Sequence, residues 1–218
     1  MTSSGVCESP SLRLSDDEVV ALAGFLERPW PSPVATVDVT SSEDVLAAVS
    51  RGWRSLSIRE LVVDGVPDPG GLQLALEVCE GTIIARSFLA ETSLVPSSRG
   101  AVTTLVLSAR GTEVFVNNAN PLGVHTLGRV SPWTARKMLR AVTDATYVHG
   151  ITGEEGADAL TLCLVGVAGT DGSPASALEV SLGSLKSFKS DADGRLAELP
   201  SPGIYTDEID RFIAAMFP

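Results

Sequence analysis

Hydrophobic residues near the start of the chain recur at intervals of three and four, which is the spacing of one buried helix face. The clearest such stretch ends before Pro29. Ser15 and Glu18 stand at its start with the spacing of a capping box, in which each side chain accepts a hydrogen bond from the other residue's backbone amide. The pattern predicts a helix from Ser15 onward. Its apolar positions are Val19, Leu22, Ala23 and Leu26.

Two further stretches have the same spacing. Residues 41–53 begin with acidic side chains and predict a second helix that ends near Gly52, because glycine is common just past helix ends. Residues 67–81 predict a third helix. Its apolar face would consist of Leu72, Ala75, Leu76 and Cys79. Between these two helices, residues 52–65 fit a strand as well as they fit a helix.

From residue 82 onward the apolar spacing changes to the alternation that is typical of β-strands. Arg110 and Gly111 have the composition of a tight hairpin turn. A helix over residues 131–145 follows, with Ser131 as its N-cap and Pro132 at the first helical position, where a missing N–H costs nothing. The predicted strands are residues 82–90, 101–110, 111–118 and 124–130. The apolar stripe of the helix is Ala135, Met138, Leu139 and Val142.

The last third of the chain repeats this order of strands followed by a helix. Residues 159–169, 176–194 and 195–205 predict strands, and residues 206–217 predict a closing helix with Thr206 as its cap. The stripe of that helix is Ile209, Phe212, Ile213 and Met216. The predicted order is three helices, a group of strands and a helix, and then a second group of strands and a helix. This order indicates an α+β fold with helices packed on an antiparallel β-sheet.

The predicted organisation is a disordered tail over residues 1–14 and a single α+β domain over residues 15–218. Residues 15–145 and 146–218 have a similar order of elements, so the domain fits two pseudo-repeated strand–helix halves. The similarity lies in the order of elements and not in the residues themselves. An internal duplication therefore stays open.

Charge argues against two classes of partner. The chain has 16 Lys and Arg against 27 Asp and Glu, a formal net charge of −11. This charge repels phosphate backbones and anionic membrane surfaces. The first residues contain no basic segment followed by an apolar run, and the apolar runs are far shorter than a membrane span. We expect a cytoplasmic protein that neither binds nucleic acid nor inserts into a membrane.

Nucleophilic catalysis lacks its usual parts in this sequence. There is no G-x-S-x-G motif, and His125 and His149 are the two histidines of the chain. Cys163 stands in an apolar run, where a thiol usually fills space in the core. Residues distant in sequence can still be neighbours in the fold. A small-molecule ligand-binding domain or an enzyme with a cavity around Cys163 and His125 is therefore kept as an alternative.

No cofactor or metal site is predicted. The glycine clusters GITGEEG and GVAGTDG fit neither of the phosphate-binding glycine motifs and are interpreted as turns. Cys7, Cys79 and Cys163 are scattered and form no Cys-x-x-Cys pair. Acidic residues in the first turns of the predicted helices, such as Asp16 and Glu18, are attributed to the helix dipole.

Three helices followed by strands also fit a winged-helix regulator. The third predicted helix, over residues 67–81, contains no Lys or Arg. A recognition helix needs such side chains to contact phosphates and base edges. Together with the acidic net charge, this disfavours DNA binding, which is the second alternative.

Four stretches of the first two-thirds form a characteristic series. LSDDEVVALAGFL is an opening helix, and SEDVLAAVSRGWRSLSIRELVVDGVPDPGGLQLALEVCE is a block of two further helices. Strands follow around TTLVLSARGTEVFV, and LGRVSPWTARKMLRAV leads from a strand into a helix. This series, roughly Leu14 to Ala145, resembles the EspG family of type VII secretion-associated chaperones of actinobacteria. The last third is similar in outline and lacks an equivalent of the middle helical pair.

The resemblance implies a cytosolic chaperone with no enzymatic activity and no requirement for ATP or metal. Members of that family bind secretion substrates of the PE–PPE type and cover an apolar helical tip. The implied partner is a small helical secreted protein. Such binding requires an exposed apolar loop or groove with a polar rim, because desolvation of the partner's tip supplies the binding free energy.

Two predicted loops meet this requirement. ETSLVPSSRG contains Leu94, Val95 and Pro96 between polar residues, and NANPLGVH contains Pro121, Leu122 and His125. An ordinary turn would also explain the second loop, because Asn and Gly tolerate left-handed backbone and Pro fixes one corner. The predicted partner contacts are Leu94, Val95, Pro96, Pro121, Leu122 and His125.

Overall fold

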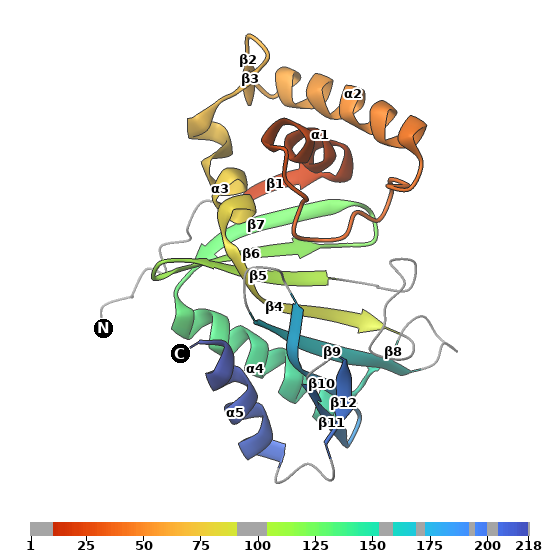
Figure 1. Ribbon diagram of the computed structural model, residues 1–218, viewed down its shortest axis with the longest axis vertical. Coiled ribbons are helices and arrows are strands. Elements are labelled where there is room, and N and C mark those ends of the chain that lie inside the picture. The colour runs from red at the N-terminus through yellow and green to blue at the C-terminus, as the bar shows by residue number, and fades with distance from the viewer. Residues whose placement is uncertain are drawn as a thin grey trace, which may run out of the picture.

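The computed structural model describes residues 11–90, 104–152, 159–168, 173–191, 195–199 and 205–217. Within them it has five helices and a ten-stranded antiparallel sheet, which confirms the predicted α+β class (Figure 1). The helices are α1 (Asp16–Leu26), α2 (Ser42–Ile58), α3 (Pro69–Glu80), α4 (Pro132–His149) and α5 (Tyr205–Met216).

Most of the strands fall within the predicted segments, with one clear exception: the single strand predicted over residues 176–194 is two antiparallel strands, Ser173–Ser181 and Ser184–Ser190, joined by a turn at Leu182 and Gly183. Those of the main sheet are β1 (Leu12–Ser15), β4 (Thr82–Ala90), β5 (Thr104–Arg110), β6 (Glu113–Ala119), β7 (Val124–Val130), β8 (Ile151–Thr152), β9 (Ala159–Ala168), β10 (Ser173–Ser181), β11 (Ser184–Ser190) and β12 (Leu196–Glu198). A separate small hairpin consists of β2 (Val62–Val63) and β3 (Val66–Pro67).

The main sheet has the order β1-β7-β6-β5-β4-β9-β10-β11-β12, with β8 paired to β9. Strands β4 to β7 form one antiparallel series and β9 to β12 form another. The two series meet where β4 pairs with β9, in a register that places Phe88 opposite Cys163. One continuous sheet therefore runs through both of the predicted halves.

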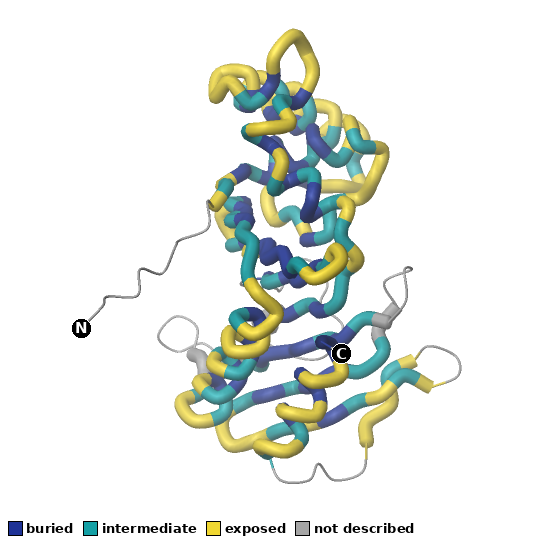
Figure 2. The backbone as a smooth tube through the Cα atoms, turned by 90° about the vertical axis from the view of Figure 1, so that its left-hand side faces the viewer, coloured by how far each residue is buried: buried dark blue, intermediate teal, exposed yellow. Residues whose placement is uncertain are grey.

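Helices pack on both faces of this sheet because successive side chains of a strand point to opposite faces and the central strands carry apolar residues on both. On β6, Val114 and Val116 face α4 and α5, whereas Phe115 faces α1 to α3. Figure 1 shows α1, α2 and α3 at one end of the molecule and α4 and α5 at the other. Figure 2 shows buried residues along the strands and exposed ones on the outer helix surfaces and turns.

The start of α1 forms as predicted. Ser15 is the N-cap, its side chain accepts from the amide of Glu18, and the Glu18 carboxylate accepts from the amide of Ser15. The predicted disordered tail, residues 1–14, is too long. Leu12–Ser15 forms β1, which pairs with β7 at the edge of the sheet. Leu14 is buried there. Residues 1–10 lie outside the described part of the chain.

The second helix is longer than predicted. It passes through Gly52 and ends at Ile58, so Gly52 lies inside the helix and not at its end. Glycine at this position allows α2 to pack closely against α1, because a Cβ built on Gly52 would lie 2.1 Å from the backbone oxygen of Asp17 in α1. The ambiguous stretch, residues 52–65, therefore forms the last part of α2 and then the first strand and the turn of the β2–β3 hairpin, with Asp64 and Gly65 at positive φ in that turn.

The two C-terminal helices agree with their predictions in part. Residues Ile209, Phe212, Ile213 and Met216 of α5 are all buried, as the stripe predicted. Thr206 is not a cap, because the helix already includes Tyr205. In α4, Ser131 is the N-cap as predicted, but Met138 is exposed. The buried positions of α4 are Ala135, Leu139, Thr143 and Thr146.

Candidate functional site

The β6–β7 turn, residues Asn120 to Gly123, is the described part of the predicted contact surface. Leu122 at its tip is 81% exposed, and Pro121 is exposed beside it. Leu94, Val95 and Pro96 lie outside the described residues. The strand ends that flank them are placed, however: β4 ends at Ala90, and Thr104 of β5 pairs with Ala119 of β6. The end of β4 and the start of β5 therefore lie at the same end of the sheet as the β6–β7 turn.

The backbone of this turn is held by its own hydrogen bonds. Oδ1 of Asn120 accepts from the amides of Leu122 and Val124, each at 3.0 Å. The Gly123 amide donates to the Asn120 carbonyl at 3.0 Å. Gly123 has a φ of +72°, a conformation that glycine adopts without strain. Leu122 is thus an apolar side chain on a backbone with few alternative conformations.

A buried carboxylate anchors the turn to the first helix. The backbone amide of Asp16 donates to the Gly123 carbonyl at 2.8 Å, and the Asp16 side chain is 2% exposed. Its Oδ2 accepts from the amides of Ala35 and Thr36, at 2.7 and 2.6 Å, and from the Thr36 hydroxyl at 2.8 Å. Asp16 therefore joins α1, the α1–α2 connection and the β6–β7 turn.

The charge of Asp16 is stabilised by these donors. Burial alone raises the pKa of Asp16, but hydrogen bonds from His125 and from the backbone and hydroxyl of Thr36 outweigh it, so the pKa lies below its ordinary value. The attribution of this acidic residue to the helix dipole was therefore incomplete. Glu18 is also more than a helix-dipole residue, because its buried carboxylate accepts hydrogen bonds from Ser55 of α2 and from Arg59, the C-cap of that helix.

His125 does not belong to the contact surface, which corrects its prediction. Its side chain is 0% exposed, because β7 turns it toward α1 and the α1–α2 connection. Nε2 of His125 lies 2.7 Å from Oδ1 of Asp16. The indole N–H of Trp30 donates to Nδ1 at 3.3 Å, and the two rings meet edge to face. The contact with Asp16 uses a proton on Nε2, and the contact with Trp30 uses a lone pair on Nδ1.

Asn117 completes this buried cluster. Its Oδ1 lies 3.2 Å from Nδ1 of His125, and its Nδ2 has no hydrogen-bond partner among the described residues. The cluster of Asp16, Trp30, Asn117 and His125 contains an Asp–His pair, but in the described part of the chain no hydroxyl or thiol is hydrogen-bonded to the imidazole. The arrangement can fix the position of β7 against α1, and it lacks the nucleophile that an acid–base pair would activate.

The alternative site around Cys163 and His125 is not assembled. The two residues occupy one row of the sheet, through Ala119, Thr104 and Phe88. Four strand-to-strand steps of about 4.8 Å separate them by roughly 19 Å. Burial also raises the pKa of Cys163 to about 12, so its thiol stays protonated at neutral pH. Among the described residues, no group of three His, Cys, Asp or Glu side chains is placed to bind a metal ion.

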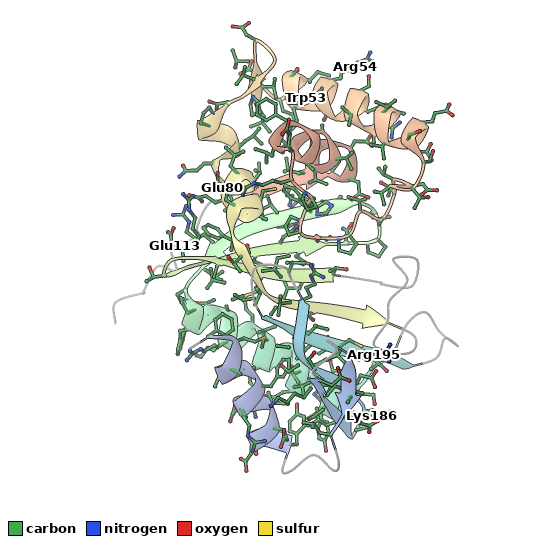
Figure 3. All side chains as sticks on the ribbon, viewed as in Figure 1. Trp53, Arg54, Glu80, Glu113, Lys186 and Arg195 are labelled. Atoms are coloured by element: carbon green, nitrogen blue, oxygen red, sulfur yellow. The ribbon has the colours of Figure 1, made fainter. Side chains whose placement is uncertain are left out.

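The charged residues on the α3 side of the sheet are largely paired with one another. Figure 3 shows Glu80 and Glu113 where the end of α3 meets the β5–β6 turn. Glu80 pairs with Arg110 at 2.9 Å, and Glu113 pairs with Arg129 at 2.9 Å. Arg129 also pairs with Glu77 at 2.5 Å, beside a cavity of about 380 Å³. The two charged residues in the wall of this cavity, Glu77 and Arg129, are paired with each other.

A second cavity has a different character. It is a groove of about 420 Å³ between α1, α2 and the connection between them, and Val20, Val45 and Val49 form much of its wall. Trp30 links this groove to the buried cluster, since it lines the groove and its indole N–H donates to His125. Sequence reasoning missed this groove because its residues come from three segments whose packing no local pattern specifies.

Comparisons with known proteins support the fold. No family model matches the chain, and no curated protein matches it. Among solved structures, the chain is similar to the Mycobacterium tuberculosis type VII secretion system chaperone EspG5, solved in complex with the PE25–PPE41 dimer, at 10% identity and a TM-score of 0.51. The similarity covers 95% of each chain. At this identity the likeness concerns architecture: this protein has an EspG-like α+β fold over nearly its whole length.

Proposed function

We propose that this protein is a cytosolic chaperone that binds an apolar helical export substrate of the PE–PPE type. The observation that carries the proposal is the likeness to EspG5 over 95% of both chains, because EspG5 was solved with a PE–PPE dimer bound. A fold can host several functions, so the proposal also needs a suitable surface on this chain. The β6–β7 turn supplies one.

The turn has the properties of a protein contact. Leu122 is 81% exposed, so a partner that covers it displaces water from its apolar surface. Its backbone is already fixed by Asn120 and Asp16. A fixed loop loses little conformational entropy on binding, and this favours affinity. The proposed surface consists of Pro121 and Leu122 together with Leu94, Val95 and Pro96 of the neighbouring loop.

Other observations agree with a protein-binding role. No described helix is long and apolar enough to span a membrane. The net charge of −11 disfavours nucleic acid as the partner. The nucleophile, base and metal-ligand combinations that an enzyme would need are not brought together among the described residues. We infer that binding, without bond-making, is the activity of the molecule.

The test is co-purification of the tagged chain with PE–PPE-type pairs encoded in the same genome. Leu122→Asp is expected to weaken capture at least ten-fold while leaving the melting temperature within about 2 °C, because the side chain is exposed. Ile58→Asp is a matched control, since Ile58 is 76% exposed at the end of α2. Capture that survives both Leu122→Asp and Leu94→Asp would reject the proposed surface, and failure to capture any pair would reject the function.

A further inference from the structure

Arg86 of β4 is a half-buried arginine whose charge has no partner in the described part of the chain. Three described arginines are half-buried, and two of them, Arg129 and Arg140, each form ion pairs with two carboxylates. Arg86 forms no ion pair and no side-chain hydrogen bond with any described residue. The chain has 27 acidic residues against 16 basic ones, so carboxylates are not scarce. The missing partner is therefore a specific feature of this position.

The terminal nitrogens of Arg86 are accessible to a partner. Its Nε atom is buried without a hydrogen-bond partner, and it is the only nitrogen of this side chain in that state. The two terminal nitrogens also lack partners among the described residues, so they retain exposed surface. These two atoms carry four of the five N–H donors of a guanidinium and can hold both oxygens of one carboxylate.

The neighbours of Arg86 in the sheet are apolar. Its register partners are Val106 of β5 and Val165 of β9, and the row continues from Val165 to Ala177 of β10. Val106 and Ala177 are buried. No acidic side chain stands beside Arg86 in this row to offset its charge. A cation in such surroundings is costly until an anion pairs with it.

The described helices leave this part of the sheet face free. Arg86 lies on the face that α1 to α3 cover, because Val106 is opposite Asn117 of the buried cluster. However, α3 packs on β5, β6 and β7 and not extensively on β4. The helices α4 and α5 pack on the opposite face, against Leu162 and Leu164, which alternate with the residues of Arg86's face (Figure 1).

Arg86 is also near the proposed contact surface. The turn that carries Leu122 follows Ala119, and the row of Ala119 runs through Thr104 to Phe88. Arg86 precedes Phe88 by two residues, which is about 7 Å along the strand. One partner surface of ordinary size, about 800 Å², can therefore cover the turn and reach Arg86.

We propose that Arg86 binds a carboxylate side chain, an Asp or a Glu, of the export substrate. This inference rests on the proposed chaperone function and adds a charged contact to the apolar one at Leu122. Arg86 lines neither of the two cavities described above, and small-molecule sites are concave, so a side chain of a protein partner fits better than a free carboxylic acid. A charge pair from which water is removed discriminates strongly between partners.

An unpaired cation should destabilise the free protein. Arg86→Met keeps the length of the side chain and removes its charge, so we expect the melting temperature to rise by about 2–4 °C. Arg129→Met is the matched control, because Arg129 is also half-buried but has two carboxylate partners, and its loss should lower the melting temperature. A lower melting temperature for Arg86→Met would reveal a stabilising partner inside the chain and overturn the inference.

The closing experiment measures the Kd of the PE–PPE-type pair that the wild-type chain captures. We expect Arg86→Met to weaken binding at least ten-fold and Arg86→Glu to weaken it further. Arg54→Met is the control for lost charge, since Arg54 is exposed on α2, away from β4 (Figure 3). Each Asp and Glu of the substrate is then changed to Arg, one at a time. One of these substrates should bind Arg86→Glu more tightly than it binds the wild type, and it identifies the carboxylate.

Equal affinities of the wild type and Arg86→Met would overturn the inference and leave the chaperone proposal standing. Failure of every charge-reversed substrate to prefer Arg86→Glu would overturn the assignment of a carboxylate. A melting temperature that rises with sodium acetate but not with sodium chloride, together with unchanged capture by Arg86→Met, would assign the site to a small carboxylic acid instead. If the wild type captures no pair, the chaperone function fails, and the contact proposed for its substrate fails with it.

Discussion

Asp16 and His125 are 109 positions apart in the sequence, yet Oδ1 of the carboxylate and Nε2 of the imidazole lie 2.7 Å apart with both side chains buried. This contact ties the first turn of α1 to β7, next to the exposed tip at Leu122. The same carboxylate also accepts three hydrogen bonds from Ala35 and Thr36. One residue thus fixes the geometry of the proposed contact surface from beneath.

Asp16→Asn should therefore destabilise the protein. The substitution removes the negative charge and leaves one acceptor oxygen for four donors, so we expect the free energy of unfolding at pH 7 to fall by about 2–4 kcal/mol. Urea denaturation provides the measurement. Asp17→Asn is the control, because Asp17 forms a surface pair with Arg51 and should cost less than about 1 kcal/mol. Equal losses in the two variants would contradict the anchoring role.

The same residue predicts a pH dependence with a definite sign. The pKa of Asp16 is lower in the folded protein than its ordinary value of 3.8, so its carboxylate stabilises the fold above about pH 4. That contribution is lost as the pH falls through the folded-state pKa. Between about pH 2 and 5, the wild type should lose more unfolding free energy than Asp16→Asn, as urea titrations at several pH values will measure. Parallel curves would count against the assignment.

Local sequence patterns predicted the elements well because each helix and strand has its own periodicity. The capping box of α1 at Ser15 and Glu18 and the α5 stripe were confirmed at the level of single residues. The start of α4 at Ser131 was confirmed for the same reason. Caps and stripes depend on neighbours three or four positions away, and such neighbours are visible in a sequence.

Long-range contacts account for what was missed. The sequence places Asp16 in a first helical turn, where acidic residues are common, so nothing local distinguishes a buried anchor from a solvated one. His125 alternates with apolar residues in a strand, and its burial depends on what α1 brings to that face. Gly52 is a residue type that is common at helix ends, but here it allows α2 to approach the backbone of Asp17, which belongs to α1. The roles of these residues depend on tertiary packing, which no local sequence pattern specifies.

Gly52 and Gly24 provide a paired prediction about glycines in helices. In an isolated helix, replacing either by alanine would add up to about 1 kcal/mol of stability. At Gly52 the new Cβ would meet backbone atoms of Asp17, which cannot move without separating α1 from α2. We expect Gly52→Ala to cost about 2–4 kcal/mol and Gly24→Ala to gain about 0.5–1 kcal/mol, as measured by chemical denaturation. Effects of the same sign in both would contradict the close approach.

Cys79 and Cys163 should be unreactive in the folded protein. Burial raises the pKa of each thiol to about 12, so about one thiol in ten thousand is ionised at pH 8. We expect iodoacetamide to leave both residues unmodified in native buffer and to alkylate both in 6 M guanidinium, as peptide mass spectrometry will detect. Rapid native alkylation of Cys163 would reopen the alternative of a reactive thiol site.

The final prediction separates a rigid contact loop from a merely exposed one. Asn120→Ala removes the acceptor for the amides of Leu122 and Val124 but leaves the exposed apolar surface of the tip unchanged. We expect faster hydrogen exchange at those two amides, a loss of about 1 kcal/mol of stability and weaker partner capture. Asn120→Asp keeps the acceptor oxygen and should restore protection of the amides. If Asn120→Ala frees the amides and capture is unchanged, the partner depends on the Leu122 side chain alone, and the pre-formed backbone of the turn contributes nothing to recognition.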